Sequence, residues 1–256
     1  MFFLIAGPCA IEDADTLHEV AAAVRSLTEA RGIRFILKSS YEKANRTRLD
    51  SFTGIGREAA LELLREAGRA QQVPVLTDVH ETADCALAAQ YADYLQIPAF
   101  LCRQTSLLLA AGATGKGVNI KKGQFMAPEG MEFAVEKVRS AGPGEVWITE
   151  RGTTFGYERL VVDMAGIPAM RAFAPVVMDC THSVQRPNQR SGVTGGDASM
   201  IATMALCGLA AGADGLFIEV HPEPARAQSD AGSMLRLDRL EPLLDQAVRV
   251  WEAVHA

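Results

Sequence analysis

Hydrophobic and polar positions along the 256-residue chain alternate between two patterns. Short, nearly continuous apolar runs are each followed by a longer segment in which apolar residues recur every three or four positions. Continuous apolar runs are typical of strands that are covered on both faces, and the wider spacing is typical of helices that cover them. The runs predicted as strands are residues 2–6, 34–38, 73–78, 94–97, 117–121, 145–150, 174–179 and 215–219.

The intervening segments are predicted as amphipathic helices. Residues 17–27 and 59–70 have one clearly apolar face, and a last helix is expected over about residues 237–254. The helical candidate 160–173 is the weakest, because Pro168 lies inside it and has no backbone N–H to donate.

Eight strand–helix units predict an α/β fold, a closed (β/α)8 TIM barrel that forms a single domain over residues 1–256. An open, doubly wound sheet is the alternative, because the same local pattern builds both. The glycine- and proline-rich pieces follow strand ends and are expected to be functional loops, although no role is assigned to loop 186–196.

Composition narrows the class of protein. With 48% apolar and 22% charged residues, the chain has the profile of a soluble globular protein. A net charge of −6 argues against nucleic acid as a partner, because such binding depends on basic residues, but it does not argue against a small phosphorylated substrate. The five cysteines form no Cys-x-x-Cys pair, which fits a reducing cytoplasm.

No segment is expected to enter a membrane. The apolar start of the chain lacks a basic leader and is interpreted as a strand. The most apolar long stretch, residues 200–220, is interrupted by Gly208, Gly212 and Asp214, so a helix followed by a buried strand is expected there. A cytoplasmic location is the resulting expectation.

Polar residues recur where the predicted strands end. In a barrel these ends face the active site. They supply Cys9, Lys38, Asp78, Gln96, Lys121, Arg151, His182 and Glu219. Any one of them has an ordinary structural interpretation, but eight in the same relative position are costly to desolvate without a function.

These residues divide into two chemical sets. The basic set comprises Lys38, Lys43, Arg46, Arg103, Lys121, Lys122 and Arg151, which form either a solvated rim or sites for phosphate and carboxylate groups. The other set is Cys9, His182, Glu219 and Asp230. Thiolate, imidazole and carboxylate are ligands for a divalent transition metal, but their spacing matches no short metal motif, so the residues alone leave metal binding open.

Eight segments together resemble one enzyme family. They are Ala6-Gly-Pro-Cys-Ala-Ile-Glu12, Phe35-Ile-Leu-Lys-Ser-Ser40, Lys43-Ala-Asn-Arg46, Gln96-Ile-Pro-Ala-Phe-Leu-Cys-Arg-Gln104, Asn119-Ile-Lys-Lys-Gly-Gln-Phe125, Thr149-Glu-Arg-Gly-Thr-Thr-Phe-Gly156, Asp179-Cys-Thr-His-Ser-Val-Gln185 and Glu219-Val-His-Pro-Glu-Pro224. Over about residues 4–240 the chain resembles 3-deoxy-D-manno-octulosonate 8-phosphate synthase. The resemblance implies a barrel enzyme, usually a homotetramer. Its reaction condenses phosphoenolpyruvate, D-arabinose 5-phosphate and water to the octulosonate 8-phosphate, a lipopolysaccharide precursor, with release of phosphate.

The resemblance also implies roles for individual residues. Lys121, Arg151 and Ala99 match contacts to the phosphoenolpyruvate phosphate, and Lys43 and Lys121 lie near its carboxylate. Asn45 matches a contact to a sugar hydroxyl, Arg46 and Thr47 match the pentose phosphate site, and Arg103 reaches that site from a neighbouring subunit. Lys38 and Gln96 complete the expected substrate-binding set, and the expected catalytic set is Lys43, Asp78, Lys121 and His182.

The resemblance assigns Cys9, His182, Glu219 and Asp230 as metal ligands. A metal-independent branch of the family carries Asn where this chain has Cys9, so the resemblance implies the metal-dependent branch. A thiolate ligand favours a borderline divalent ion, Zn or Fe(II), over Mg, with Mn, Co and Cd as further candidates.

Two rivals remain. The related 3-deoxy-D-arabino-heptulosonate 7-phosphate synthases share the Ala-Gly-Pro-Cys start, but their lysine motif typically reads Lys-Pro-Arg-Thr-Ser where this chain has Lys43-Ala-Asn-Arg-Thr47. Because that segment meets the sugar phosphate, the difference favours the octulosonate enzyme. A non-catalytic anion-binding barrel is the other rival, and it would need neither the Cys9 thiolate nor Asp230.

Overall fold

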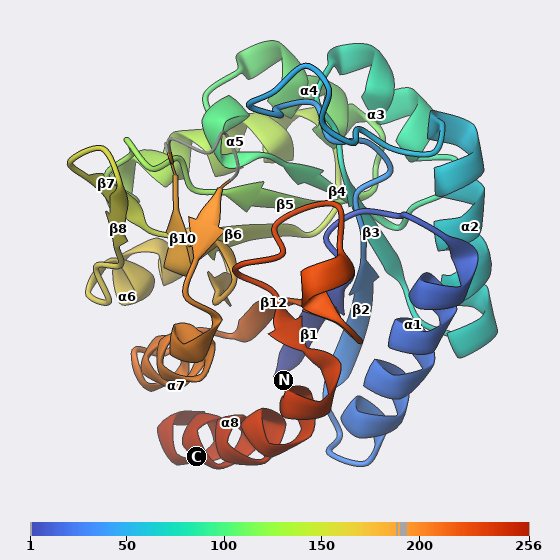
Figure 1. Ribbon diagram of the computed structural model, residues 1–256. Coiled ribbons are helices and arrows are strands. Elements are labelled where there is room, and N and C mark those ends of the chain that lie inside the picture. Colours follow the sequence, from blue (N-terminus) through green and yellow to red (C-terminus); the bar gives the residue numbers. More distant parts are fainter. Residues whose placement is uncertain (1, 188, 190–193, 256) are drawn as a thin grey trace.

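Eight parallel strands pair side by side around a central axis in the computed structural model, which describes residues 2–187, 189 and 194–255 (Figure 1). The strands are β1 (Phe3–Gly7), β2 (Arg34–Lys38), β3 (Val75–Asp78), β4 (Tyr94–Ile97), β5 (Gly117–Lys121), β6 (Val146–Glu150), β9 (Val176–Asp179) and β12 (Gly215–His221). They pair in this order, and β1 also pairs with β12. That last pairing closes the sheet, so the predicted barrel is confirmed and the open sheet is wrong.

Helices form a ring around the strands (Figure 1). They are α1 (Ala14–Glu29), α2 (Arg57–Gln71), α3 (Thr82–Ala88), α4 (Thr105–Ala113), α5 (Met131–Ala141), α6 (Gly166–Arg171), α7 (Ile201–Ala210) and α8 (Leu240–His255). The apolar stretch at residues 200–220 is α7 followed by β12, as its glycines predicted. None of the helices in the described part of the chain has the length and apolar character needed to cross a bilayer.

The helical candidate at residues 160–173 is wrong over its first half. Residues Thr153–Phe155 (β7) and Arg159–Val161 (β8) pair as an antiparallel hairpin, and only Gly166–Arg171 is helical. Pro168 is the third residue of this short helix, where its missing N–H would have no helical partner in any case.

Other short strands lie beyond the carboxyl ends of the barrel strands. After β9, Gln185–Arg186 (β10) pairs with Gly195–Gly196 (β11), and after β12, Leu235–Arg236 (β13) pairs in parallel with the end of β12. Of loop 186–196, residues 188 and 190–193 lie outside the described part of the chain. These additions build up one end of the barrel, the end at which the predicted site residues gather.

The barrel interior changes in character along its axis. Alternate strand residues face inward, and the apolar ones form a cluster of their own, separate from the core between strands and helices. At the amino end Trp147 stacks on Tyr94 and packs against the tilted ring of Phe3, with ring centroids 4.5 and 4.9 Å away. Towards the carboxyl end the inward positions become amide-bearing and then ionic.

Gly7 allows the first loop to start close to the barrel axis. A Cβ on this residue would lie 2.0 Å from the backbone oxygen of Lys38 on the neighbouring strand. The close approach of β1 to β2 therefore requires glycine, and it brings Cys9 to the mouth beside Lys38.

Candidate active site

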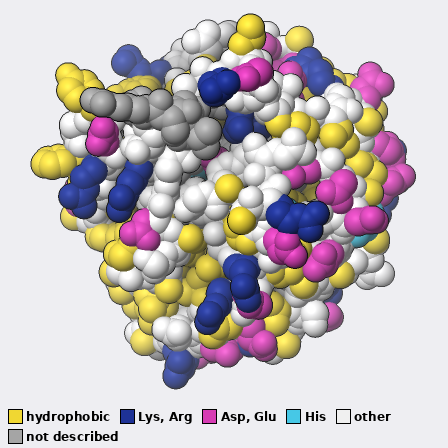
Figure 2. Space-filling view, in the orientation of Figure 1, with side chains coloured by type: hydrophobic (Ala, Val, Ile, Leu, Met, Phe, Trp, Pro, Cys, Tyr) yellow, Lys and Arg dark blue, Asp and Glu magenta, His cyan; other side chains and the backbone are white. Residues whose placement is uncertain are grey.

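The sequence-predicted strand-end residues meet at the carboxyl mouth of the barrel. All are buried except His182, which is partly exposed. The cavity between them has a volume of about 270 Å³, and its lining includes Lys38, Lys43, Asn45, Arg46, Thr47, Asp78, Gln96, Ala99, Lys121, Arg151, His182 and Asp230. Basic and acidic side chains are mixed over the face shown in Figure 2, whereas lysines and arginines outnumber carboxylates in the cavity lining.

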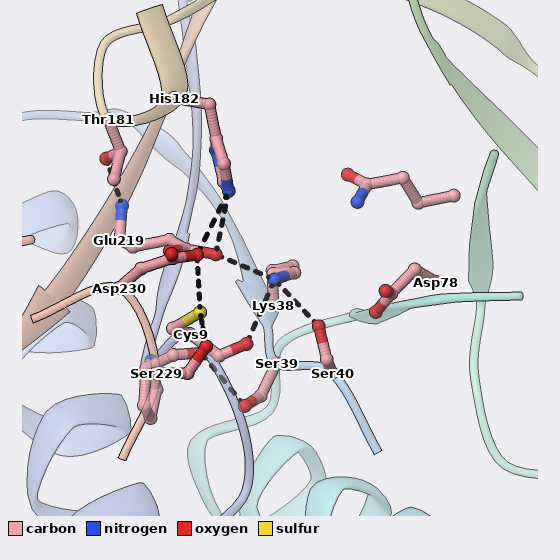
Figure 3. A network of polar contacts seen from close by, with 12 residues as sticks. Cys9, Lys38, Ser39, Ser40, Asp78, Thr181, His182, Glu219, Ser229 and Asp230 are labelled. Atoms are coloured by element: carbon pink, nitrogen blue, oxygen red, sulfur yellow. Dashed lines mark hydrogen bonds and ion pairs between the residues drawn. The ribbon is translucent and has the colours of Figure 1, made fainter. Parts of the chain in front are cut away.

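Three potential metal donors converge at one side of the mouth. Donor atoms of Cys9, Glu219 and Asp230 all lie within 4.8 Å of one another. Glu219 and Asp230 lie between Cys9 and His182 (Figure 3). The Nε2 atom of His182 is outside this triad but lies 3.7 Å from Glu219 Oε1 and 3.9 Å from Asp230 Oδ2. The four side chains that the sequence grouped are therefore brought together.

The donor set fits a divalent cation. Glu219 Oε2 is buried and has no hydrogen-bond partner among the described residues, so one carboxylate oxygen is left for a ligand. Asp230 has a φ of 49°, in the left-handed region that few residues other than glycine adopt. This strained backbone turns the Asp230 carboxylate towards Cys9 Sγ, which lies 3.3 Å from Oδ2.

Lys38 occupies the position next to this triad. Its Nζ lies 2.9 Å from Glu219 Oε1, 3.2 Å from Ser40 Oγ and 3.3 Å from the backbone oxygen of Cys9. Both Lys38 and Glu219 are almost completely buried. Burial opposes ionisation of Glu219, but the charges of Lys38 and then His182 hold the pKa of its carboxyl well below the ordinary value.

The Cys9 thiol has the opposite electrostatic environment. Burial, and then the charge of Glu219, raises the pKa of the thiol well above its ordinary value. In the metal-free protein Cys9 is therefore a thiol, and its Sγ donates to Ser229 Oγ at 3.2 Å. A cation among these ligands favours the thiolate, because metal coordination deprotonates a thiol.

Asp179, which was not among the residues predicted from the sequence, contacts both Lys121 and His182. Its Oδ2 accepts from Lys121 Nζ at 2.5 Å and lies 2.8 Å from His182 Nδ1. Burial opposes its ionisation, but the charges of His182 and Lys121 hold the pKa of the Asp179 carboxyl well below the ordinary value. Its position at the end of a buried strand, three residues before His182, is a signal that the sequence did contain.

Basic side chains line the rest of the cavity. Lys43 Nζ donates to Ser40 Oγ at 3.0 Å, and Arg46 donates to Ser229 Oγ at 2.7 Å and to the backbone oxygen of Gln228 at 3.0 Å. Arg151 donates to Gln185 Oε1 at 2.9 Å, while its buried Nη1 has no partner among the described residues. Such a cation is available to an anionic ligand.

Two predicted residues occupy less central positions. Asp78 stands apart from the network around Lys38 (Figure 3), and it is paired with His80, whose Nε2 lies 3.2 Å from Asp78 Oδ2. His80 lines the cavity but was missed from the sequence, because a lone histidine two residues after a strand carries no motif. Arg103 is exposed and outside the cavity lining, so this chain alone does not bring it to the site.

The fold and the mouth define a (β/α)8-barrel protein whose cavity is lined by lysine and arginine side chains, beside a group of side chains that could hold a metal ion. Residues 1–255 match the sequence model of the DAHP synthetase I family. The chain is 49% identical to a 2-dehydro-3-deoxyphosphooctonate aldolase of Koribacter versatilis, with 98% of this chain and 92% of that protein covered.

Proteins of the same name in other bacteria are similarly close. One from Nitratidesulfovibrio vulgaris strain DP4 is 49% identical over 99% of this chain and 93% of its own length. One from Bartonella henselae is 45% identical over 95% of this chain and 88% of its own length. The chain therefore belongs to the DAHP synthetase I family, in its 2-dehydro-3-deoxyphosphooctonate aldolase group.

Proposed function

We propose that this chain condenses phosphoenolpyruvate with D-arabinose 5-phosphate and water to 3-deoxy-D-manno-octulosonate 8-phosphate and inorganic phosphate. The name carried by its relatives describes this product, since a 2-dehydro-3-deoxyoctonate is a 3-deoxy-2-ulosonic acid of eight carbons. The observation that carries the proposal is the carboxyl-end cavity, where Lys43, Arg46, Lys121 and Arg151 surround a space next to the metal-competent triad.

We assign different parts of the cavity to the two substrates. We assign Lys121, Arg151 and Ala99 to the phosphoenolpyruvate phosphate and Lys43, with Lys121, to its carboxylate. We assign Asn45 to a hydroxyl of the pentose, and Arg46 with Thr47 to its phosphate. Both substrates are multiply charged anions, so buried cations offset their repulsion and hold them in one orientation.

The reaction joins C3 of phosphoenolpyruvate, a weak carbon nucleophile, to the aldehyde carbon of the pentose phosphate. Water adds at C2, and the resulting hemiketal phosphate loses phosphate to leave the ketone. The chain's part is to bind both anions, exclude bulk solvent and place a proton donor or acceptor near the aldehyde oxygen and the water. We assign this proton transfer to Asp78, which lines the cavity and is paired with His80, because both ring nitrogens of His182 face other groups, Asp179 on one side and the carboxylates of Glu219 and Asp230 on the other.

We further propose that the enzyme is of the metal-dependent kind, with Cys9, His182, Glu219 and Asp230 as ligands. A bound divalent ion supplies Lewis acidity or orientation at the aldehyde or water. The unpartnered Glu219 oxygen and the thiol beside two carboxylates support this assignment. Zn or Fe(II) is the expected ion, with Mn, Co and Cd as alternatives.

Phosphate release from phosphoenolpyruvate tests the reaction. The purified protein is assayed with arabinose 5-phosphate and, separately, with erythrose 4-phosphate, the acceptor of the heptulosonate synthases. Faster release with the five-carbon aldose supports the proposal. Preference for the four-carbon aldose would assign the heptulosonate reaction instead, and release with neither would favour a non-catalytic anion-binding barrel.

Chelation tests the metal. Activity is expected to disappear in excess chelator and to return with a divalent ion, and metal analysis is expected to give one ion per chain. A second test is Cys9→Asn, which should reduce the dependence on added metal. Full activity of a chelated sample that elemental analysis shows to be metal-free would contradict the assignment.

The remaining expectations are also proposals. The whole chain, residues 1–256, is taken as one catalytic barrel that works in the cytoplasm and supplies the lipopolysaccharide inner core. The exposed position of Arg103 suits a homotetramer in which this side chain reaches the pentose phosphate of a neighbouring subunit. Light scattering, and an Arg103→Ala variant with a raised KM for arabinose 5-phosphate, would test that arrangement.

A further inference from the structure

Asp179 uses both oxygens of its buried carboxylate. Oδ1 accepts from the backbone N–H groups of Thr181 at 3.1 Å and His182 at 2.8 Å, which fixes the turn after β9. Oδ2 serves two side chains, Lys121 Nζ at 2.5 Å and His182 Nδ1 at 2.8 Å. One oxygen atom is therefore shared between two residues that come from different strand ends.

These two partners belong to different halves of the site assigned above. His182 directs Nε2 towards the carboxylates of Glu219 and Asp230, on the cation side. Lys121 lies above the ring of Phe217, with Nζ 3.6 Å from the ring centroid, and lines the cavity on the side assigned to phosphoenolpyruvate. Asp179 is the described carboxylate that contacts both.

The shared oxygen also determines which ring nitrogen of His182 carries a proton. A carboxylate oxygen can only accept, so Nδ1 carries a proton, and when His182 binds a cation it does so through the lone pair on Nε2. Because Nδ1 then donates to Asp179, the 3.2 Å contact between Lys121 Nζ and Nδ1 is not a hydrogen bond. Both groups instead share the negative charge of one oxygen.

We propose that Asp179 is a positioning residue that couples cation binding to phosphoenolpyruvate binding. A cation on Nε2 makes the Nδ1–H group of His182 a stronger donor to Asp179. Less of the Asp179 charge then neutralises Lys121, whose ammonium group becomes more available to the substrate anion. The coupling is therefore positive, and by linkage each ligand strengthens binding of the other by the same factor.

This inference rests on the proposed function, and a binding experiment without turnover separates the two. Calorimetric titration gives the affinity of the chelated and the Zn-loaded protein for phosphoenolpyruvate in the absence of any aldose. In wild type, Zn is expected to tighten phosphoenolpyruvate binding by about 5- to 150-fold. In Asp179→Asn, this factor is expected to fall towards one, and the affinity for Zn alone is expected to fall about 10- to 100-fold.

A spectroscopic readout excludes a merely structural effect. The Co(II)-loaded wild type should show a change in its visible bands when phosphoenolpyruvate is added, and the change should be lost in Asp179→Asn. Steady-state kinetics should show a raised KM for phosphoenolpyruvate with little change in KM for arabinose 5-phosphate, whose phosphate is assigned to Arg46.

Asp214→Asn is the matched control. Asp214 accepts from the backbone N–H of Val176 at 2.9 Å and from Arg171, so it supports the opposite end of the same strand. This variant should retain the wild-type coupling factor. Lys121→Gln provides a second variant that keeps the Asp179–His182 contact, and it should weaken phosphoenolpyruvate binding without weakening Zn binding.

The outcomes are distinguishable. A wild-type coupling factor in Asp179→Asn overturns the inference and leaves the proposed function standing. The same holds if Asp179→Asn binds Zn as wild type does, or if Lys121→Gln loses Zn affinity. Wild type that fails to bind phosphoenolpyruvate overturns the proposed function and the inference with it.

Discussion

The two ends of the barrel are built from the same eight strands but hold different chemistry. At the amino end the rings of Phe3, Tyr94 and Trp147 pack against one another, and Arg34 lies over the rings of Tyr94 and Trp147 at 5.9 and 5.6 Å. Burial, and then the hydrogen bond to Glu145, raises the pKa of Tyr94 to about 12, so this hydroxyl remains a donor. This end is a plug.

At the carboxyl end the inward positions are ionic. Lys38, Lys121, Asp179 and Glu219 are nearly fully buried, and all are paired. Desolvating such groups costs several kcal/mol per ion, and pairing offsets this only in part. The comparison teaches that the apolar end supplies stability, whereas the ionic end costs desolvation energy and is the part to which we assign substrate binding.

The largest expected effect is at the amino end. Trp147→Ala removes the ring that contacts both Phe3 and Tyr94 and should lower the free energy of unfolding by about 3–5 kcal/mol. Because the ring is remote from the mouth, kcat/KM of the folded fraction should stay near wild type. Urea denaturation and phosphate release measure the two quantities, and Trp147→Phe is the matched milder variant. A large loss of kcat/KM in folded Trp147→Ala would break the division between the ends.

At the mouth, removal of the whole ion pair should abolish activity without lowering stability, the reverse of the result expected for Trp147→Ala. Replacing Lys38 or Glu219 alone leaves an unpaired buried charge and should lower stability by about 3–5 kcal/mol. The double variant Lys38→Met, Glu219→Leu removes both charges with little change in volume. Its free energy of unfolding should equal that of wild type or exceed it by up to about 1–4 kcal/mol. It should nevertheless release no phosphate from phosphoenolpyruvate. A double variant as unstable as the single ones would show that the pair itself stabilises the fold.

The same division explains what the sequence could predict. The barrel, its strand order and the strand-end residues follow from a hydrophobic period and from the rule that parallel strands end at one face. The hairpin at Thr153–Phe155 and Arg159–Val161 was not predicted, because apolar residues on a short exposed strand imitate part of a helix. Mistakes of this kind fall in the loops, where tertiary contacts override local pattern.

Site residues show the same limit. Cys9, His182, Glu219 and Asp230 were grouped because their chemistry is distinctive, and the structure brings them together. Ser229 was not, although its hydroxyl contacts both Cys9 Sγ and Arg46 Nη1. Its role depends on the left-handed turn at the next residue, and neither serine nor that turn has a signature in the sequence.

The same substitution, arginine to glutamine, can be made separately at each end of the barrel. Arg46→Gln at the mouth removes a cation assigned to the pentose phosphate and should raise KM for arabinose 5-phosphate by about 10- to 150-fold, the worth of a charged hydrogen bond of about 1.5–3 kcal/mol. Arg34→Gln at the amino end loses partly exposed contacts to Tyr94 and Glu145 and should lower stability by at most about 1 kcal/mol, with unchanged kinetics. Equal loss of affinity for both substrates in Arg46→Gln would contradict the assigned split.

The smallest effect concerns the pH dependence of stability at the mouth. Burial opposes charging of His80, but the hydrogen bond and then the charge of Asp78 hold the pKa of His80 above its ordinary value. Asp84 acts in the same direction and Lys43 in the opposite one. Because the folded-state pKa is raised, this contribution is fully present below the unfolded value of about 6.5 and is lost as pH rises through the folded value.

The His80→Gln variant isolates this contribution. The difference in unfolding free energy between wild type and variant should be about 0.5–1.5 kcal/mol at pH 6 and smaller at pH 8.5. The pKa of Asp78 is lowered, so its own contribution is lost only in acid, below the window compared here. Denaturant midpoints of both proteins at the two pH values give the answer. A difference that grows towards pH 8.5 would mean that His80 is neutral in the folded protein, and that Asp78 depends on Lys38 and Lys43 for its charge.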